Sequence, residues 1–257
     1  MTSHSVSRED ILDALQNALE PLDYVKAMWQ GGAAAFGRVD QWSDVDLMVI
    51  ADDEHVEGVM RLVDEALEAL SPITSRYELP QPSWHGHLQT FYRLEGASRF
   101  HFVDFVVMKQ SNEKRFLECE IHGEALFYFD RIGGLADVHI DESAHLEAMQ
   151  ARAKELAFEF DFFAEIVEKE ILRENWLDAL PYYTRFTLMP LMEILRMQHS
   201  PGRYNFYTRY ATEDLPAELI AEIEPFFFPQ PGADFAAKND AARALFTKAL
   251  KGLDWGE

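Results

Sequence analysis

The sequence contains almost no cysteine and few cationic residues. Cys119 is the only cysteine among 257 residues, which excludes an internal disulfide and a metal cluster built from cysteines. Lysine and arginine number 23 against 45 aspartates and glutamates, so the formal net charge is −22. Such a surface repels the phosphates of DNA and RNA, and the few cations are scattered rather than gathered in a patch. The sequence therefore predicts no nucleic-acid partner.

Long apolar runs are also missing. No uninterrupted apolar stretch approaches the ~20 residues that a membrane-spanning helix needs. Residues 1–15 lack the basic-then-apolar order of a secretory signal. Apolar residues still make up 48% of the chain and charged residues 26%, a balance typical of folded globular proteins. We therefore expect a cytoplasmic protein that makes no use of a membrane.

The periodicity of the apolar residues changes near residue 140. Before that point, helical patterns alternate with β-branched runs typical of strands, and after it only helical patterns follow. We expect helices at 7–22 and 54–70 and strands at 25–30, 45–51, 73–79, 85–94 and 99–109. Later helical patterns cover 144–176, 176–200 and 239–255. The sequence thus predicts an α+β domain over residues 1–140 and an all-helical domain over residues 141–257.

Two aspartates open the strand expected at residues 45–51. Asp44 and Asp46 are one residue apart, so in an extended chain their side chains point to the same face and their charges repel. A solvated turn is the ordinary explanation of such a pair. A cation bound between the two carboxylates is the alternative.

Asp104 favours the cation. It lies inside the apolar strand expected at residues 99–109, where a carboxylate is costly to bury unless a cation or hydrogen bonds compensate its charge. If this strand lies beside residues 45–51, three carboxylates meet, and hard oxygen ligands are the donors that Mg²⁺ prefers. The small-residue turn GGAAAFG, residues 31–37, would let backbone amides approach a phosphate. Together these features predict phosphoryl or nucleotidyl transfer.

The stretch GRVDQWSDVDLMV, residues 37–49, follows a glycine-rich turn and opens an apolar strand with Ser-Asp-x-Asp. With the later strand aspartate, it resembles the polymerase-β-type nucleotidyltransferase superfamily, in particular the bacterial branch of aminoglycoside and lincosamide nucleotidyltransferases. The resemblance covers mainly residues 25–110. It implies a mixed-sheet nucleotidyltransferase core followed by a helical substrate-binding domain. It also implies that Asp44, Asp46 and Asp104 are both the catalytic residues and the Mg²⁺ ligands.

The resemblance further implies the reaction, which is transfer of a nucleoside monophosphate, usually AMP from ATP, with release of pyrophosphate. ATP or another nucleoside triphosphate would be the co-substrate. Its expected contacts are residues of the turn and strand entry together with basic residues of the helical domain: Gly31, Gly32, Ala33, Ser43, Arg203 and Arg209. For the two arginines, an ordinary packing loop is the alternative. The sequence departs from the family at Ala33, where serine is usual, and at Phe36, where arginine is frequent.

The acceptor is a matter of inference from charge. The acidic chain suits a cationic small molecule, so we expect transfer to a hydroxyl of an aminoglycoside-like antibiotic. Two alternatives stay open: an antitoxin that adenylylates and binds a toxin protein, and a catalytically silent nucleotidyltransferase-like binding module. His85 and His87 lie two residues apart without an evident third nitrogen ligand, so surface or loop histidines are a simpler interpretation than a metal site.

Overall fold

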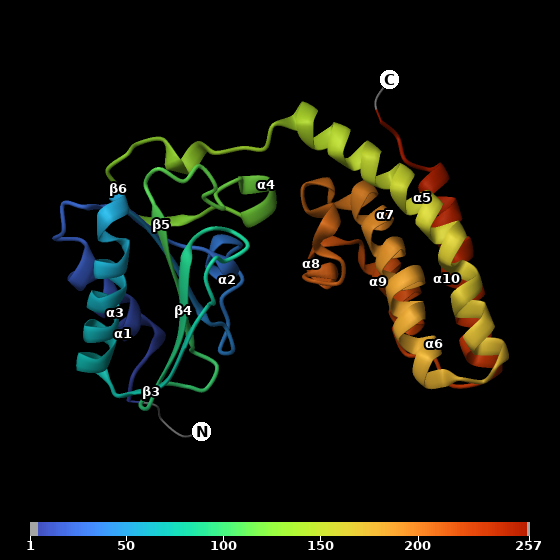
Figure 1. Ribbon diagram of the computed structural model, residues 1–257, viewed down its shortest axis with the longest axis horizontal. Helices are drawn as coiled ribbons and strands as arrows, with labels where there is room; N and C mark the ends of the chain where they lie inside the picture. The colour runs from blue at the N-terminus through green and yellow to red at the C-terminus, as the bar shows by residue number, and fades with distance from the viewer. Residues whose placement is uncertain (1–4, 256–257) are drawn as a thin grey trace. The chain divides into compact units, whose positions relative to one another are not determined.

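The structure, a computed structural model, describes residues 5–255. The chain divides into two compact units, Met1–His139 and Ile140–Glu257, here named the N-terminal unit and the helical unit. The N-terminal unit combines a sheet with helices, and the second unit is helical throughout its regular structure (Figure 1). The predicted α+β class, a mixed sheet followed by a helical part, is confirmed. Within residues 5–255 no helix combines the length and the apolar character needed to cross a bilayer.

Six strands form one mixed sheet in the N-terminal unit, in the order β3-β4-β5-β2-β1-β6. The central neighbours β2 and β5 run parallel, and the other neighbouring pairs run antiparallel. The strands are β1 (Val25–Gln30), β2 (Val45–Ala51), β3 (Ile73–Glu78), β4 (Leu88–Leu94), β5 (Val103–Lys109) and β6 (Leu126–Asp130). The two strands that carry the predicted aspartates therefore lie side by side in the middle of the sheet.

Helices α1 (Arg8–Leu19) and α3 (Val56–Leu70) pack against each other and cover one face of the sheet (Figure 1). Helix α1 begins at a capping box, in which the Ser7 hydroxyl accepts the Asp10 N–H and the Asp10 carboxylate accepts the Ser7 N–H. The apolar sides of both helices meet alternate residues of β2, which gives the unit its larger core.

The opposite face of the sheet carries a smaller apolar cluster. Trp29, Ile50 and Met108 pack there with Leu117, which follows β5, and Leu135, which follows β6. Successive residues of a strand point to opposite faces. The residues of β2 at odd positions, 45, 47 and 49, belong to the core under α1 and α3, so position 46 is turned to the second face.

The helical unit is built around α5 (Glu142–Leu172), α7 (Met189–His199) and α10 (Ala233–Lys251), and α10 packs on both of the others. Shorter helices complete it: α6 (Trp176–Tyr183), α8 (Ala211–Asp214) and α9 (Ala217–Ile223). A π-helical turn, Thr184–Leu188, joins α6 to α7. The helical pattern at 176–200, which the sequence shows as interrupted by proline, thus forms two helices joined by this turn.

Candidate functional site

Asp46 and Asp104 lie opposite each other at the centre of the sheet. They are register partners in the parallel pair of β2 and β5, and paired residues of neighbouring strands point to the same face. Asp44 lies two positions before Asp46, and its negative charge acts on Asp104. The structure thus brings Asp46 and Asp104 together and places Asp44 within electrostatic range of them.

The surroundings of Asp104 disfavour its negative charge. Burial raises the pKa of the Asp104 carboxyl to about 6, a hydrogen bond from Gln89 acts in the opposite direction, and the charge of Asp44 raises the pKa further. The Gln89 bond runs from Nε2 to Asp104 Oδ1 over 2.7 Å. No lysine or arginine is among the groups that shift the pKa of Asp104. A cation bound beside Asp104 would act against the effects of burial and of the Asp44 charge.

Gly32 lies against the carboxylate of Asp46. Its backbone is in the left-handed region, with φ of 54°, and a Cβ at this position would overlap Oδ2 of Asp46. The preceding N–H, from Gly31, donates to the Asp46 carbonyl oxygen over 3.2 Å. The short helix α2 (Gly32–Ala35) therefore begins beside the aspartates. Glycine is needed at position 32 for both its backbone conformation and its missing side chain.

Ser43 and Ala33 are the remaining residues of the N-terminal unit that are predicted to contact the nucleotide. The Ser43 hydroxyl donates to Oδ1 of Asp40 and accepts the Asp40 N–H, both over 2.9 Å, so it closes the turn before β2. Ala33 is half-buried next to Gly32 and has no polar side-chain atom. Contact of Ser43 and Ala33 with a nucleotide stays a prediction.

Arg203 and Arg209 belong to the loop that follows α7 in the helical unit. Arg203 forms an ion pair with the buried carboxylate of Asp214, with Nη2 and Oδ1 2.8 Å apart. Arg209 is exposed, and its guanidinium donates to the Tyr210 hydroxyl over 3.0 Å. These contacts support the alternative of a packing loop for Arg203. Binding of the triphosphate by either residue stays a prediction.

Arg196, which the sequence interpretation did not single out, organises this loop. Its side chain is completely buried. Nε donates to the Tyr207 carbonyl oxygen over 2.6 Å, Nη1 to Asp214 Oδ2 over 2.9 Å, and Nη2 to the Arg209 carbonyl oxygen. The available signal was an arginine between the apolar residues Leu195 and Met197, since a buried cation must be paired.

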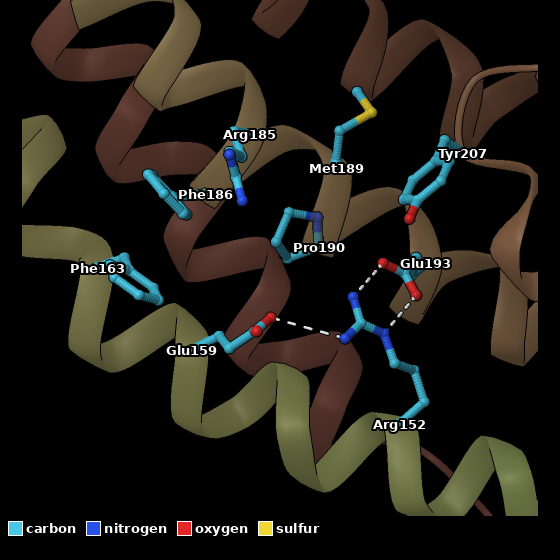
Figure 2. Close-up of a pocket in the computed structure, with 9 residues that line it drawn as sticks. All are labelled: Arg152, Glu159, Phe163, Arg185, Phe186, Met189, Pro190, Glu193 and Tyr207. Carbon is cyan, nitrogen blue, oxygen red and sulfur yellow. Dashed lines mark hydrogen bonds and ion pairs between the residues drawn. The ribbon is translucent and has the colours of Figure 1, made fainter.

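The helical unit contains a pocket of about 530 Å³ (Figure 2). Arg152 of α5 forms one wall and donates two hydrogen bonds to Glu193 of α7, over 2.9 and 2.8 Å. Figure 2 shows the hydroxyl of Tyr207 directed toward Glu193. On another side, the rings of Phe163 and Phe186 stack with their centroids 4.5 Å apart. The pocket therefore combines aromatic surface with charged groups.

Carboxylates outnumber the cation at that wall. Besides Glu193, the Arg152 guanidinium is paired with Glu155 at 2.7 Å and with Glu159 at 3.6 Å. Glu159 also lines the pocket, as does the exposed cation of Arg185. The charged residues that line the pocket are thus two arginines and two glutamates, and its aromatic faces can attract amino groups through cation–π contacts.

The aspartates of the sheet fit a divalent cation by their chemistry. Among residues 5–255 no group of three His, Cys, Asp or Glu side chains stands close enough to form a ready-made metal site. Asp44, Asp46 and Asp104 nevertheless offer only hard oxygen donors, the kind that Mg²⁺ prefers. Burial and the charge of Asp44 both raise the pKa of Asp104, and a nearby cation would act in the opposite direction.

Comparisons with known proteins give little guidance. No protein-family model matches the chain, and no curated protein matches its sequence. One similar solved structure is the STING-associated CdnE c-di-GMP synthase from Capnocytophaga granulosa, with a TM-score of 0.31 and 13% sequence identity, where the match covers 95% of this chain and 77% of that chain. A TM-score this low does not establish a common fold. Membership of the aminoglycoside branch in particular stays a prediction.

Proposed function

We propose that this protein is a Mg²⁺-dependent nucleotidyltransferase. It would transfer a nucleoside monophosphate, AMP from ATP in the first instance, to a hydroxyl group of a small molecule. The observation that carries the proposal is the register of Asp46 with Asp104 in adjacent parallel strands, with Gly32 packed on the Asp46 carboxylate. This arrangement agrees with the Ser-Asp-x-Asp resemblance, in which Asp46 is the second aspartate.

Asp44, Asp46 and Asp104 would hold the metal. When bound, Mg²⁺ neutralises the triphosphate charge and makes the acceptor hydroxyl more acidic. The carboxylates in turn orient the nucleotide through the ion that they hold. The backbone amides of the turn at Gly31 and Gly32 lie beside the Asp46 carboxylate, where they could approach a phosphate of the nucleotide.

Asp104 is the candidate general base. The acceptor oxygen forms a bond to the α-phosphorus, and the bond from that phosphorus to the bridging oxygen of pyrophosphate breaks, so pyrophosphate leaves with the electron pair. The hydroxyl proton passes to Asp104. Because Oδ1 of Asp104 already accepts the hydrogen bond from Gln89, the proton would go to Oδ2.

The pocket of the helical unit is the candidate acceptor site. Its aromatic faces, with the carboxylates of Glu159 and Glu193 among its lining residues, support an acceptor that carries amino groups, as an aminoglycoside does. The strongly acidic chain adds a long-range attraction for such a cation, which raises its rate of association.

The test is label transfer from ATP, in Mg²⁺, to a panel of aminoglycosides and to candidate protein partners. We expect transfer by the wild type and by Asp23→Ala, an exposed aspartate of the same unit, and none by Asp44→Ala, Asp46→Ala or Asp104→Ala. Transfer that survives Asp46→Ala would refute the proposal. Label on a protein instead of an aminoglycoside would assign the adenylylating antitoxin. Absence of both label transfer and Mg²⁺-dependent ATP binding would assign the silent binding module.

A further inference from the structure

Gln89 of β4 touches the candidate base directly. Its Nε2 donates to Oδ1 of Asp104 over 2.7 Å. The two ends of an amide differ, because the nitrogen only donates and the oxygen only accepts, whereas a carboxylate only accepts. If the amide were turned around, its oxygen would face the carboxylate and repel it. The orientation of Gln89 therefore decides whether Asp104 is held or pushed away.

His85 sets that orientation. Its Nε2 lies 3.0 Å from Oε1 of Gln89. Since Oε1 only accepts, this contact is a hydrogen bond only if Nε2 carries the proton. With its oxygen bound to His85, Gln89 presents its nitrogen to Asp104.

The backbone assigns the tautomer of His85. The N–H of His87 donates to Nδ1 of His85 over 3.0 Å, and a backbone N–H cannot accept in return. Ser83 Oγ is 3.2 Å from the same nitrogen, but its hydrogen is donated to the His87 carbonyl oxygen over 2.8 Å. Nδ1 is therefore the acceptor, and from these partners we assign the proton to Nε2.

Neighbouring rings restrain the imidazole. The side chain is 5% exposed. Trp84 meets it edge-on at 4.9 Å between centroids, the His87 ring stacks on it at 5.1 Å, and Phe116 lies edge-on at 5.9 Å. Because the ring is restrained, its Nε2 stays directed at Oε1 of Gln89. The Gln89 nitrogen therefore stays directed at Asp104.

We propose that His85 and Gln89 are positioning residues that hold the Asp104 carboxylate in its reactive orientation. The donors run in one direction, from the His87 N–H through the His85 imidazole and the Gln89 amide to Asp104. Neither side chain is assigned contact with substrate. The role in catalysis rests on the proposed function. The hydrogen-bond chain itself rests on geometry alone.

Three variants test the role in catalysis. His85→Phe keeps a ring but removes the Nε2 donor, Gln89→Met removes both ends of the amide, and His85→Gln restores a side-chain donor. Loss of such an outer partner costs about 10–100-fold in activity or metal affinity. We expect kcat to fall by that factor in the first two variants, with the KM for ATP within about twofold of the wild type, and to recover in His85→Gln.

The matched control is Gln16→Met on α1. Gln16 also donates to a carboxylate, Glu20, over 2.8 Å, but at an exposed position. We expect wild-type kinetics from this control. Circular dichroism and the midpoint of urea unfolding identify any variant that fails to fold, and the kinetic comparison then uses those that do.

Two readouts need no turnover. The first is binding of Mn²⁺ alone, followed by electron paramagnetic resonance, which should weaken about 10-fold in His85→Phe and Gln89→Met but not in Gln16→Met. The second is the nitrogen NMR spectrum of the imidazoles, which should show the proton of His85 on Nε2. A proton on Nδ1 of His85 would overturn the proposal, as would wild-type Mn²⁺ affinity and kcat in both variants.

These outcomes separate the positioning role from the proposed function. Transfer and Mn²⁺ binding in the wild type, with no change in the variants, would refute the positioning role and leave the nucleotidyltransferase standing. Absence of both transfer and Mn²⁺ binding in the wild type would refute the nucleotidyltransferase, and the positioning role would fall with it.

Discussion

Replacing Gly32 by alanine tests whether the glycine turn is shaped by the Asp46 carboxylate. The chain offers a matched control in Gly37, whose φ of 63° is close to the 54° of Gly32. A Cβ at Gly37 would meet nothing within 4 Å, whereas a Cβ at Gly32 would overlap Asp46 Oδ2 and lie 3.2 Å from the Asp46 Cβ. Both variants therefore lose stability because alanine is strained at a positive φ, and only Gly32→Ala also places its Cβ on the Asp46 carboxylate.

The expected magnitudes follow from that difference. An alanine in the left-handed region costs about 1–2 kcal/mol, which both variants lose. Forcing a methyl group into an occupied space costs about 1–3 kcal/mol more, and Gly32→Ala alone bears this cost. Rotation of the Asp46 carboxylate relieves only part of it, because the Asp46 Cβ is also within 3.2 Å. We therefore expect Gly32→Ala to be less stable than Gly37→Ala by about 1–3 kcal/mol.

Urea unfolding measures the stability difference, and Mn²⁺ binding with label transfer measures the consequence for the site. Because relief of the overlap displaces the carboxylate, Gly32→Ala should lose Mn²⁺ binding and transfer, while Gly37→Ala should keep both. Equal stability of the two variants, together with intact Mn²⁺ binding in Gly32→Ala, would refute the reasoning.

Three further predictions concern other parts of the molecule. Burial lowers the pKa of His87 to about 4, below the unfolded value of about 6.5. The free energy of unfolding should therefore be highest above pH ~6.5 and fall by up to about 3 kcal/mol as the pH drops toward 4. Urea midpoints that show the same pH dependence in the wild type and in His87→Gln would contradict this. Arg196→Met removes the donor to the Tyr207 and Arg209 carbonyl oxygens and one of the two arginine partners of Asp214. It should cost about 3–5 kcal/mol in urea unfolding, and a loss below about 1 kcal/mol would be too small for this structural role. Glu159→Gln removes one carboxylate from the pocket and should weaken aminoglycoside binding several-fold in calorimetry at unchanged stability, whereas unchanged affinity would exclude the pocket as the acceptor site.

Local patterns predicted most of the sheet. The uninterrupted apolar run of β2 and the hairpin of β4 and β5 are recognisable because β-branched and aromatic residues cluster between turn residues. β6 was not predicted. Its five residues, LFYFD, carry no clear alternation, and the strand exists because it pairs with β1, about 100 residues earlier in the chain. The strand expected to begin at residue 99 begins at Val103, since residues 99–102 belong to the loop before it.

The candidate site was predictable only in part. Asp104 was visible because a carboxylate in an apolar strand needs compensation, but its register with Asp46 depends on which strands are neighbours. No local pattern encodes the parallel pairing of β2 with β5. The roles of Gln89 and His85 could not be predicted either, because they depend on which atoms lie next to one another in the fold. A glutamine and a histidine near a strand are ordinary residues until the partner atoms are known.

Ala33 gives the sharpest test of the resemblance itself. The family usually has serine at this position, and the hydroxyl of Ser43 is occupied by hydrogen bonds with Asp40, so it does not replace the missing group. Ala33 is half-buried, so a serine there would keep access to water and would not bury an unsatisfied hydroxyl. A hydrogen bond to a charged group contributes about 1.5–3 kcal/mol, which corresponds to roughly 10–100-fold in affinity. If a phosphate lies beside this turn, Ala33→Ser should lower the KM for ATP by about 10-fold or more with little change in kcat. Ala33→Val, which adds bulk without a donor, should not do so. An unchanged KM for ATP in Ala33→Ser would mean that the triphosphate does not contact the turn, and the glycines at 31 and 32 would then serve only the packing against β2.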